Sequence, residues 1–117
     1  MNYLMIGAIS GGLVVIMGAF GAHALNEILD DYGKSIYNKA VLYHMFHSIA
    51  ILILGLINKI QPEIQLSMAG WSFVFGIILF SGSLYILAIT GIKSLGMITP
   101  IGGILFIIGW VLLVLKV

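Results

Sequence analysis

The chain has 117 residues, of which 62% are hydrophobic and only 8% are charged, and its mean hydropathy is +1.21. A soluble domain carries about a quarter charged residues, so this composition excludes an ordinary soluble domain and indicates a membrane protein. The formal net charge is +1 and the five lysines are scattered, which excludes the basic stripe that nucleic-acid binding requires. Because the chain has no cysteine, it has no disulfide, thiolate zinc site or cysteine nucleophile.

Four apolar stretches are long enough to cross a hydrocarbon core about 30 Å thick, which takes about 20 helical residues. They cover residues 3–25, 38–58, 66–90 and 97–115. The first contains Ala22-His23-Ala24, which has the form of a signal-peptide cleavage site, but it lacks a basic beginning and is too long for a signal sequence. We therefore expect one all-α membrane domain over residues 1–117, an antiparallel bundle of four transmembrane helices.

Most of the charged side chains lie in the connections between these stretches. In residues 26–37 they interrupt a weak helical repeat, which predicts a short interfacial helix between the first two spans. Before the fourth span, residues 95–99 either add an apolar turn ahead of a kink at Pro100 or dip into the membrane. The lysines leave the orientation open, because two lie with the termini, Lys59 and Lys116, and three lie opposite, Lys34, Lys39 and Lys93.

Small residues recur along the first and fourth spans at spacings that place them on one helical face. Such a face lets a neighbouring backbone approach closely, although glycine is also simply common in membrane helices. The regular spacing favours helix packing. The predicted packing residues are Gly7, Gly11, Gly18 and Ala22 in the first span and Gly102 and Gly109 in the fourth.

Three histidines lie where the first two spans share a loop: His23 ends the first span, and His44 and His47 begin the second. Antiparallel packing predicts all three in one leaflet, with His44 and His47 on one face. Imidazoles bind transition metals, haem iron or protons, but a metal site usually needs three or four supported ligands. We therefore predict no metal site and interpret the histidines as hydrogen-bonding side chains between helices. Metal or haem ligation and a proton or quinone site remain the alternatives.

A second polar cluster, Phe80-Ser81-Gly82-Ser83-Leu84-Tyr85, lies in the half of the third span that returns to the histidines. Ser81 and Tyr85 share a helical face, although serines in membrane helices commonly bond to their own backbone. No nucleophile elbow, phosphate loop, HExxH pattern or intramembrane pair of carboxylates is present. We therefore expect no catalytic residues, no cofactor and no enzymatic activity. The candidate polar site comprises His23, His44, His47, Ser81, Ser83 and Tyr85.

Four segments stand in order along the chain: Gly18-Ala19-Phe20-Gly21-Ala22-His23-Ala24-Leu25, His47, the cluster at 80–85, and Thr99-Pro100-Ile101-Gly102-Gly103. Together they resemble the small membrane proteins grouped as domain of unknown function 423, over nearly the whole chain. The resemblance implies a multi-pass protein of the bacterial cytoplasmic membrane with four helices, and it implies no reaction. His23 and His47 fall on the family's usual histidine positions, whereas glutamine is more usual at position 44, so a function common to the family must work without His44.

Three classes of function fit these observations. The first is a non-enzymatic packing protein, either a homo-oligomer or an accessory subunit of a larger membrane complex, and the glycine-lined faces motivate it. The second is a small transporter or channel, similar in size to the four-helix multidrug exporters, in which histidine replaces the membrane-embedded acid. The third is a membrane protein that binds a lipid, a quinone or haem. Membrane lipids are the expected partners in every case.

Overall fold

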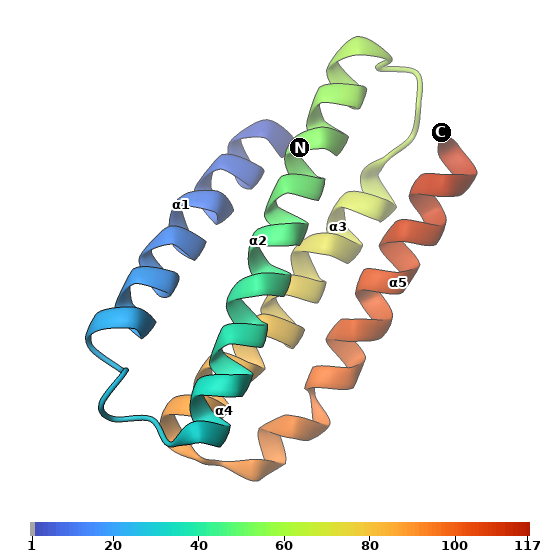
Figure 1. The fold of residues 1–117 in the computed structure, drawn as a ribbon. Helices are drawn as coiled ribbons and strands as arrows, with labels where there is room; N and C mark the ends of the chain where they lie inside the picture. Colours follow the sequence, from blue (N-terminus) through green and yellow to red (C-terminus); the bar gives the residue numbers. More distant parts are fainter. Residues whose placement is uncertain (1) are drawn as a thin grey trace.

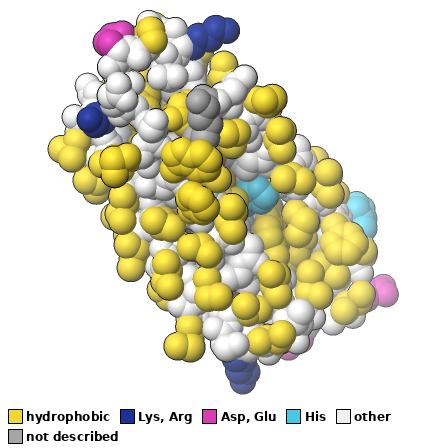
Figure 2. Space-filling view, turned by 180° about the vertical axis from the view of Figure 1, so that it is seen from behind, with side chains coloured by type: hydrophobic (Ala, Val, Ile, Leu, Met, Phe, Trp, Pro, Cys, Tyr) yellow, Lys and Arg dark blue, Asp and Glu magenta, His cyan; other side chains and the backbone are white. Residues whose placement is uncertain are grey.

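The computed structural model describes residues 2–117, and its secondary structure there is helical. Four segments are long and apolar enough to cross a membrane: Tyr3–His23, Asp31–Ile60, Ser67–Thr90 and Lys93–Lys116. They run up and down, and the start of α1 and the end of α5 lie at the same end of the molecule (Figure 1). Charged side chains lie towards the two ends, and hydrophobic side chains cover the flank between them (Figure 2). The predicted all-α fold with four spanning helices is confirmed.

The first two helices are each started by a side-chain cap. Helix α1 (Tyr3–His23) begins after Asn2, whose side chain accepts the Met5 N–H at 3.0 Å. Helix α2 (Asp31–Ile60) begins after Asp30, whose carboxylate accepts the Gly33 N–H at 2.7 Å. Such caps satisfy backbone N–H groups that have no partner within the helix. The capping by Asp30 therefore fixes where the second span starts.

The separate interfacial helix predicted for residues 26–37 is not present. Residues 24–30 form a turn, and residues 31–37 are the first turns of α2. Two leucines of the turn, Leu25 and Leu29, are buried against α2 and the third span. The apolar repeat that suggested an interfacial helix thus belongs partly to a buried turn and partly to a continuous helix capped by Asp30.

The third span is one continuous helix in three parts: α3 (Ser67–Gly76), the π-helix η1 (Ile77–Gly82) and α4 (Ser83–Thr90). It ends at Gly91, whose φ of 72° lies in the left-handed region that glycine adopts readily. The fourth span begins with the 3-10 helix η2 (Lys93–Met97) and continues as α5 (Thr99–Lys116). Residues 93–97 thus form a short 3-10 turn that leads into α5, and Pro100 lies in the first turn of that helix.

The four spans form an open row in which each packs chiefly on the next: α1 on α2, α2 on the third span, and the third span on α5 (Figure 1). Two hydrophobic clusters hold the row together. One contains Ile51, Leu54 and Phe73 and lies towards the end that carries the termini. The other contains Ile36 and Leu84 and lies towards the opposite end. Residues 41–49 of α2 lie between the two clusters.

Three of the predicted packing residues make close contacts within the chain. A Cβ at Gly7 would lie 2.8 Å from Cγ of Leu52, and one at Gly109 would lie 2.6 Å from Cε1 of Phe73. A Cβ at Gly102 would collide with the backbone of Phe80 in η1. Each of these distances is too short for a real Cβ, so glycine lets α1 approach α2, and α5 approach the third span.

The other three predicted packing residues make no close contact within the chain. Gly11 has no neighbouring atom within 4 Å of a built Cβ, Gly18 has one ordinary contact at 3.7 Å to Val41, and Ala22 is exposed. The reason is that α1 has its one main neighbour in α2, and its buried positions Tyr3, Gly7 and Val14 follow that contact. The predicted small-residue face of α1 is therefore only partly used inside the chain.

Candidate functional site

His44 and His47 lie near the middle of α2. His44 follows Asp31 by thirteen residues and precedes Ile60 by sixteen, which places it about 20 Å and about 24 Å from the two helix ends. The two imidazoles are 5% and 3% exposed. The sequence placed them in the first turns of the second span, but α2 begins at Asp31 instead of residue 38, so they lie two turns deeper.

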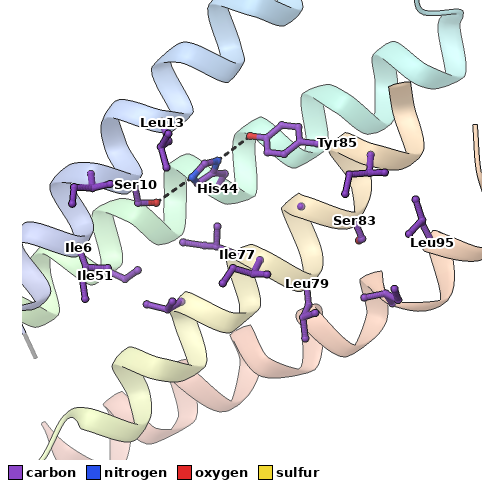
Figure 3. A pocket seen from close by; sticks show the side chains of 16 residues that line it. Ile6, Ser10, Leu13, His44, Ile51, Ile77, Leu79, Ser83, Tyr85 and Leu95 are labelled. Carbon is purple, nitrogen blue, oxygen red and sulfur yellow. Dashed lines mark hydrogen bonds between the residues drawn. The ribbon is translucent and has the colours of Figure 1, made fainter. Parts of the chain in front are cut away.

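His44 is the centre of a chain of hydrogen bonds that joins three spans (Figure 3). Its Nδ1 lies 2.9 Å from the hydroxyl of Tyr85 in α4, and its Nε2 lies 3.1 Å from Oγ of Ser10 in α1. Ser10 Oγ in turn lies 2.5 Å from Oγ of Ser48. Ser48 donates to the backbone carbonyl of His44 at 2.7 Å, which closes the chain on α2.

The direction of every hydrogen bond in this chain follows from the bond that Ser48 donates to the carbonyl of His44. Because Ser48 donates its only hydroxyl proton to the carbonyl of His44, it can only accept from Ser10, and Ser10 must therefore be the donor to Ser48. Ser10 then has no proton left, so His44 Nε2–H must donate to Ser10, and the bare Nδ1 accepts from the hydroxyl of Tyr85. A neutral His44 with its proton on Nε2 satisfies every member of the chain. A protonated His44 would add an unpaired buried charge and turn Tyr85 away from its acceptor.

The same chain forms part of the wall of an elongated groove between α1 and the third span, with α2 as its floor. This cavity, which we call the α1 groove, has a volume of about 570 Å³. Figure 3 shows the side chains that line it, and Figure 2, which looks onto the face opposite that of Figure 1, shows a histidine among hydrophobic side chains. The lining includes Ile6, Ile9, Ser10 and Leu13 of α1, His44 and Ile51 of α2, and Val74, Ile77, Leu79, Gly82, Ser83, Tyr85 and Ile86 of the third span.

His47 faces α5 instead of α1. Its Nδ1–H donates to the carbonyl of Tyr43 at 2.8 Å, and its Nε2 accepts the indole N–H of Trp110 at 3.0 Å. Its ring stacks on Phe106, with centroids 3.5 Å apart and planes 9° apart. His47 therefore fits the neutral Nδ1–H tautomer, opposite to that of His44. It borders a second groove, of about 680 Å³, between α2 and α5.

The structure does not bring His23 to the other two histidines. His23 is the exposed last residue of α1, and a short turn connects it to the start of α2. His47 lies sixteen residues beyond Asp31, about 24 Å along the helix. Within residues 2–117, no three His, Cys, Asp or Glu side chains are grouped so that they could hold a metal ion.

The predicted hydroxyl cluster is divided among three neighbours. Ser81 donates to the carbonyl of Ala40 in α2 at 2.8 Å. Ser83 donates to the carbonyl of Phe80 at 2.9 Å and contacts Oγ1 of Thr99 at 2.6 Å. Tyr85 is the member that reaches a histidine, His44. Ser81 and Ser83 thus tie the third span to α2 and to the start of the fourth span.

Two members of the His44 chain, Ser10 and Ser48, were missed by the sequence analysis. Ser48 follows His44 by four residues, a spacing that puts the two side chains on one helical face. Ser10 is the hydroxyl in the middle of an otherwise apolar first span. Both signals were present, but only the packing of α1 on α2 shows that these hydroxyls meet.

Comparison with known proteins identifies the family of the chain. The family model described as "Protein of unknown function (DUF423)" matches residues 17–103. A UPF0382 membrane protein of Staphylococcus epidermidis is 49% identical over 113 residues, which cover 97% of this chain and 92% of the relative. The UPF0382 membrane protein YwdK of Bacillus subtilis is 42% identical over 113 residues, which cover 96% of this chain and 92% of the relative. No solved structure matches.

The predicted family is thereby confirmed over most of the chain. These bacterial relatives are named as membrane proteins, in agreement with the four apolar helices of the structure. The chain is an integral, multi-pass membrane protein that belongs to the DUF423 family of proteins of unknown function.

Proposed function

We propose that this chain is a non-enzymatic membrane protein that binds a small amphiphilic molecule from the lipid phase in the α1 groove. One observation carries the proposal: the hydrogen-bonded chain around His44 lies in the wall of an otherwise apolar cavity near the middle of the longest helix. Ligand sites in proteins are typically apolar cavities with a few placed polar groups. Polar side chains at membrane depth often mark functional sites.

The size and shape of the groove support a chain-like ligand. Its volume of about 570 Å³ lies within the range of about 300–1,000 Å³ common for small-molecule sites. Its lining on the third span extends from Val74 to Ile86, about 18 Å along the helix axis. The groove therefore runs roughly parallel to the helices, as the hydrocarbon chains of the surrounding lipids do.

The titratable groups of the groove favour binding over catalysis. His44 and Tyr85 are hydrogen-bonded to one another, so neither is free to act as a general base while the chain is intact. The acidic side chains, Glu27, Asp30, Asp31 and Glu63, lie in the connections or at a helix start. A proton-coupled transporter that uses both His23 and His47 receives less support. His23 is the last residue of α1, whereas His47 lies near the middle of α2, so the two imidazoles are far apart along the helix axes.

Photolabelling of the protein in lipid nanodiscs tests the groove. The probe is a dodecyl methyl ether that carries a diazirine in its chain, and labelled peptides are identified by mass spectrometry. We expect labelling concentrated on residues 6–13 and 74–86, and a several-fold decrease in Gly82→Leu. Gly82 lines the groove, and the nearest atom to its built Cβ is 4.0 Å away, so leucine fills the groove without a backbone clash.

The matched control for this experiment is Gly11→Leu. Gly11 also has open space around a built Cβ, but it does not line the groove. Its labelling should equal that of the natural chain. Labelling spread evenly over all lipid-facing surfaces, or unchanged by Gly82→Leu, would contradict the proposed binding function.

A second candidate function is assembly, as a homo-oligomer or as an accessory subunit, through the outer face of α1. The observation that favours it is that a Cβ built at Gly11 meets no atom of the chain within 4 Å, although small residues of this kind promote close helix contact in membranes. Gly11→Leu should then reduce crosslinking between copies, or to a partner, in native membranes. Here Gly82→Leu is the control. Unchanged crosslinking in Gly11→Leu would remove this candidate and leave the binding proposal intact.

A further inference from the structure

The hydroxyl groups in the wall of the α1 groove have already donated their protons to protein atoms. Ser10 donates to Ser48, Tyr85 donates to His44, and Ser83 donates to the carbonyl of Phe80. The proton on His44 Nε2 goes to Ser10. A hydroxyl has one proton but two acceptor lone pairs. The wall therefore offers a ligand lone pairs, on Ser10 Oγ and on the Tyr85 hydroxyl, and no free O–H or N–H from these side chains.

A ligand head that only accepts hydrogen bonds finds no partner in this wall. To serve an ether, ester or ketone oxygen, Tyr85 would have to turn its proton away from His44 and leave Nδ1 buried without a partner. Such an unsatisfied buried group is costly in an apolar setting. A head that donates a hydrogen bond needs no such rearrangement, because it can use a lone pair that is present in the intact chain.

The lining of the groove also bears on the charge and the direction of the ligand. The lining residues include no Lys, Arg, Asp or Glu, so a charged head would lose its hydration without a counter-charge. The polar side chains of the groove lie towards one part of it. Ile6, Ile51 and Ile77 line the part that leads towards the end carrying the termini (Figure 3).

We propose that the α1 groove selects a neutral, single-chain amphiphile whose head is a hydroxyl group that donates a hydrogen bond. The hydroxyl lies beside Ser10 and Tyr85 and donates to one of their lone pairs. The apolar chain extends past Ile6, Ile51 and Ile77. This inference rests on the proposed binding function and adds the chemistry of the head to it.

The test compares dodecanol with dodecyl methyl ether, in which a methyl group replaces the hydroxyl hydrogen, so that the ether head accepts but cannot donate a hydrogen bond. The full chain, labelled with ¹⁵N-histidine in phosphatidylcholine nanodiscs, is titrated with each compound at equal mole fraction in the bilayer. Nitrogen chemical shifts report on His44, whose signals are identified by their loss in His44→Gln. We expect dodecanol to reach half-saturation at an about fivefold lower mole fraction, as one additional hydrogen bond of ordinary strength produces. The signals of His47, which faces α5, should not move.

Gly82→Leu serves as the binding-site control and should abolish the shift of His44 with both compounds. Half-saturation at the same mole fraction, or tighter binding of the ether, would overturn the selectivity for a hydroxyl head while leaving the proposed function in place. If neither compound moves the His44 signals, both the selectivity and the proposed function are overturned.

Discussion

At the scale of single residues, the two buried histidines are neutral connectors with opposite tautomers. His44 donates from Nε2 and accepts at Nδ1, whereas His47 donates from Nδ1 and accepts at Nε2. Among residues 2–117, the buried side-chain nitrogen and oxygen atoms all have a hydrogen-bond partner. This agrees with the cost of an unsatisfied polar group in lipid. Each of the four ring nitrogens of these two imidazoles has a partner within the protein.

The hydrogen bonds of His44 should contribute to the free energy of unfolding. The same substitution, histidine to phenylalanine, made at His44 and at His23 tests this. His44→Phe leaves the Tyr85 hydroxyl without its acceptor and Ser10 without its donor, so we expect a loss of about 2 kcal/mol in the free energy of unfolding. His23→Phe changes an exposed residue at the end of α1 and should stay within about 0.5 kcal/mol. Denaturant unfolding in bicelles measures both. Equal losses in the two variants would contradict the role of His44.

At the scale of helices, one of the contacts that hold the third span against α5 is a close approach of two backbones. Gly102 packs against the backbone of Phe80 within the π-helix η1, whereas Gly103 faces only the side chain of Phe80, at 3.7 Å or more. A π-turn places one more residue in the turn than an α-helix does. Ser81 and Ser83, on either side of Gly82, bond to different neighbours, Ala40 and Thr99.

Alanine at these two adjacent glycines should therefore have opposite effects. Gly102→Ala forces α5 away from η1 and should destabilise the protein by about 2 kcal/mol, as overpacked sites do. Gly103→Ala meets only ordinary contacts and gains helix propensity, which is worth up to about 1 kcal/mol. Thermal unfolding in detergent, followed by circular dichroism, measures the difference. A Gly102→Ala variant as stable as Gly103→Ala would show that the close approach is unimportant.

At the scale of the whole molecule, the open row of helices creates the α1 groove. Helix α1 is held chiefly by α2, and Tyr3 near its start packs against Gly70 of α3. At the opposite end, the buried turn containing Leu25 and Leu29 packs on α2 and α4. Between these two contacts α1 and the third span stand apart, and the His44 chain bridges them.

The arrangement of the ends can be measured directly, because the chain has no cysteine of its own. Lys59→Cys and Lys116→Cys lie at the end that carries the termini, and Lys93→Cys lies at the opposite end. A membrane-impermeant maleimide should label the first two from the same side of intact cells or inverted vesicles, and the third from the other side. Labelling of Lys59→Cys and Lys116→Cys from different sides would exclude four spanning helices.

The candidate site was only partly predictable from the sequence. His44, Ser83 and Tyr85 were named as candidates, and all three line the α1 groove. The expected placement of His23, His44 and His47 in one leaflet rested on placing the start of the second span near residue 38. The capping of α2 by Asp30 places that start at Asp31, seven residues earlier, so His47 lies about 24 Å along the helix from its beginning.

The sequence by itself determined that the chain is helical, that four of its segments are long and apolar enough to cross a membrane, and which family it belongs to. These features depend on the composition of the chain, on the length of its apolar runs and on short motifs. All three can be read from the sequence without knowing which segments pack together. The tertiary structure alone decided which glycines pack, which hydroxyls meet His44 and where the groove lies. These depend on the rotation and depth of each helix against its neighbour, and the contacts that set both, such as Gly102 against the backbone of Phe80, join residues far apart in the sequence.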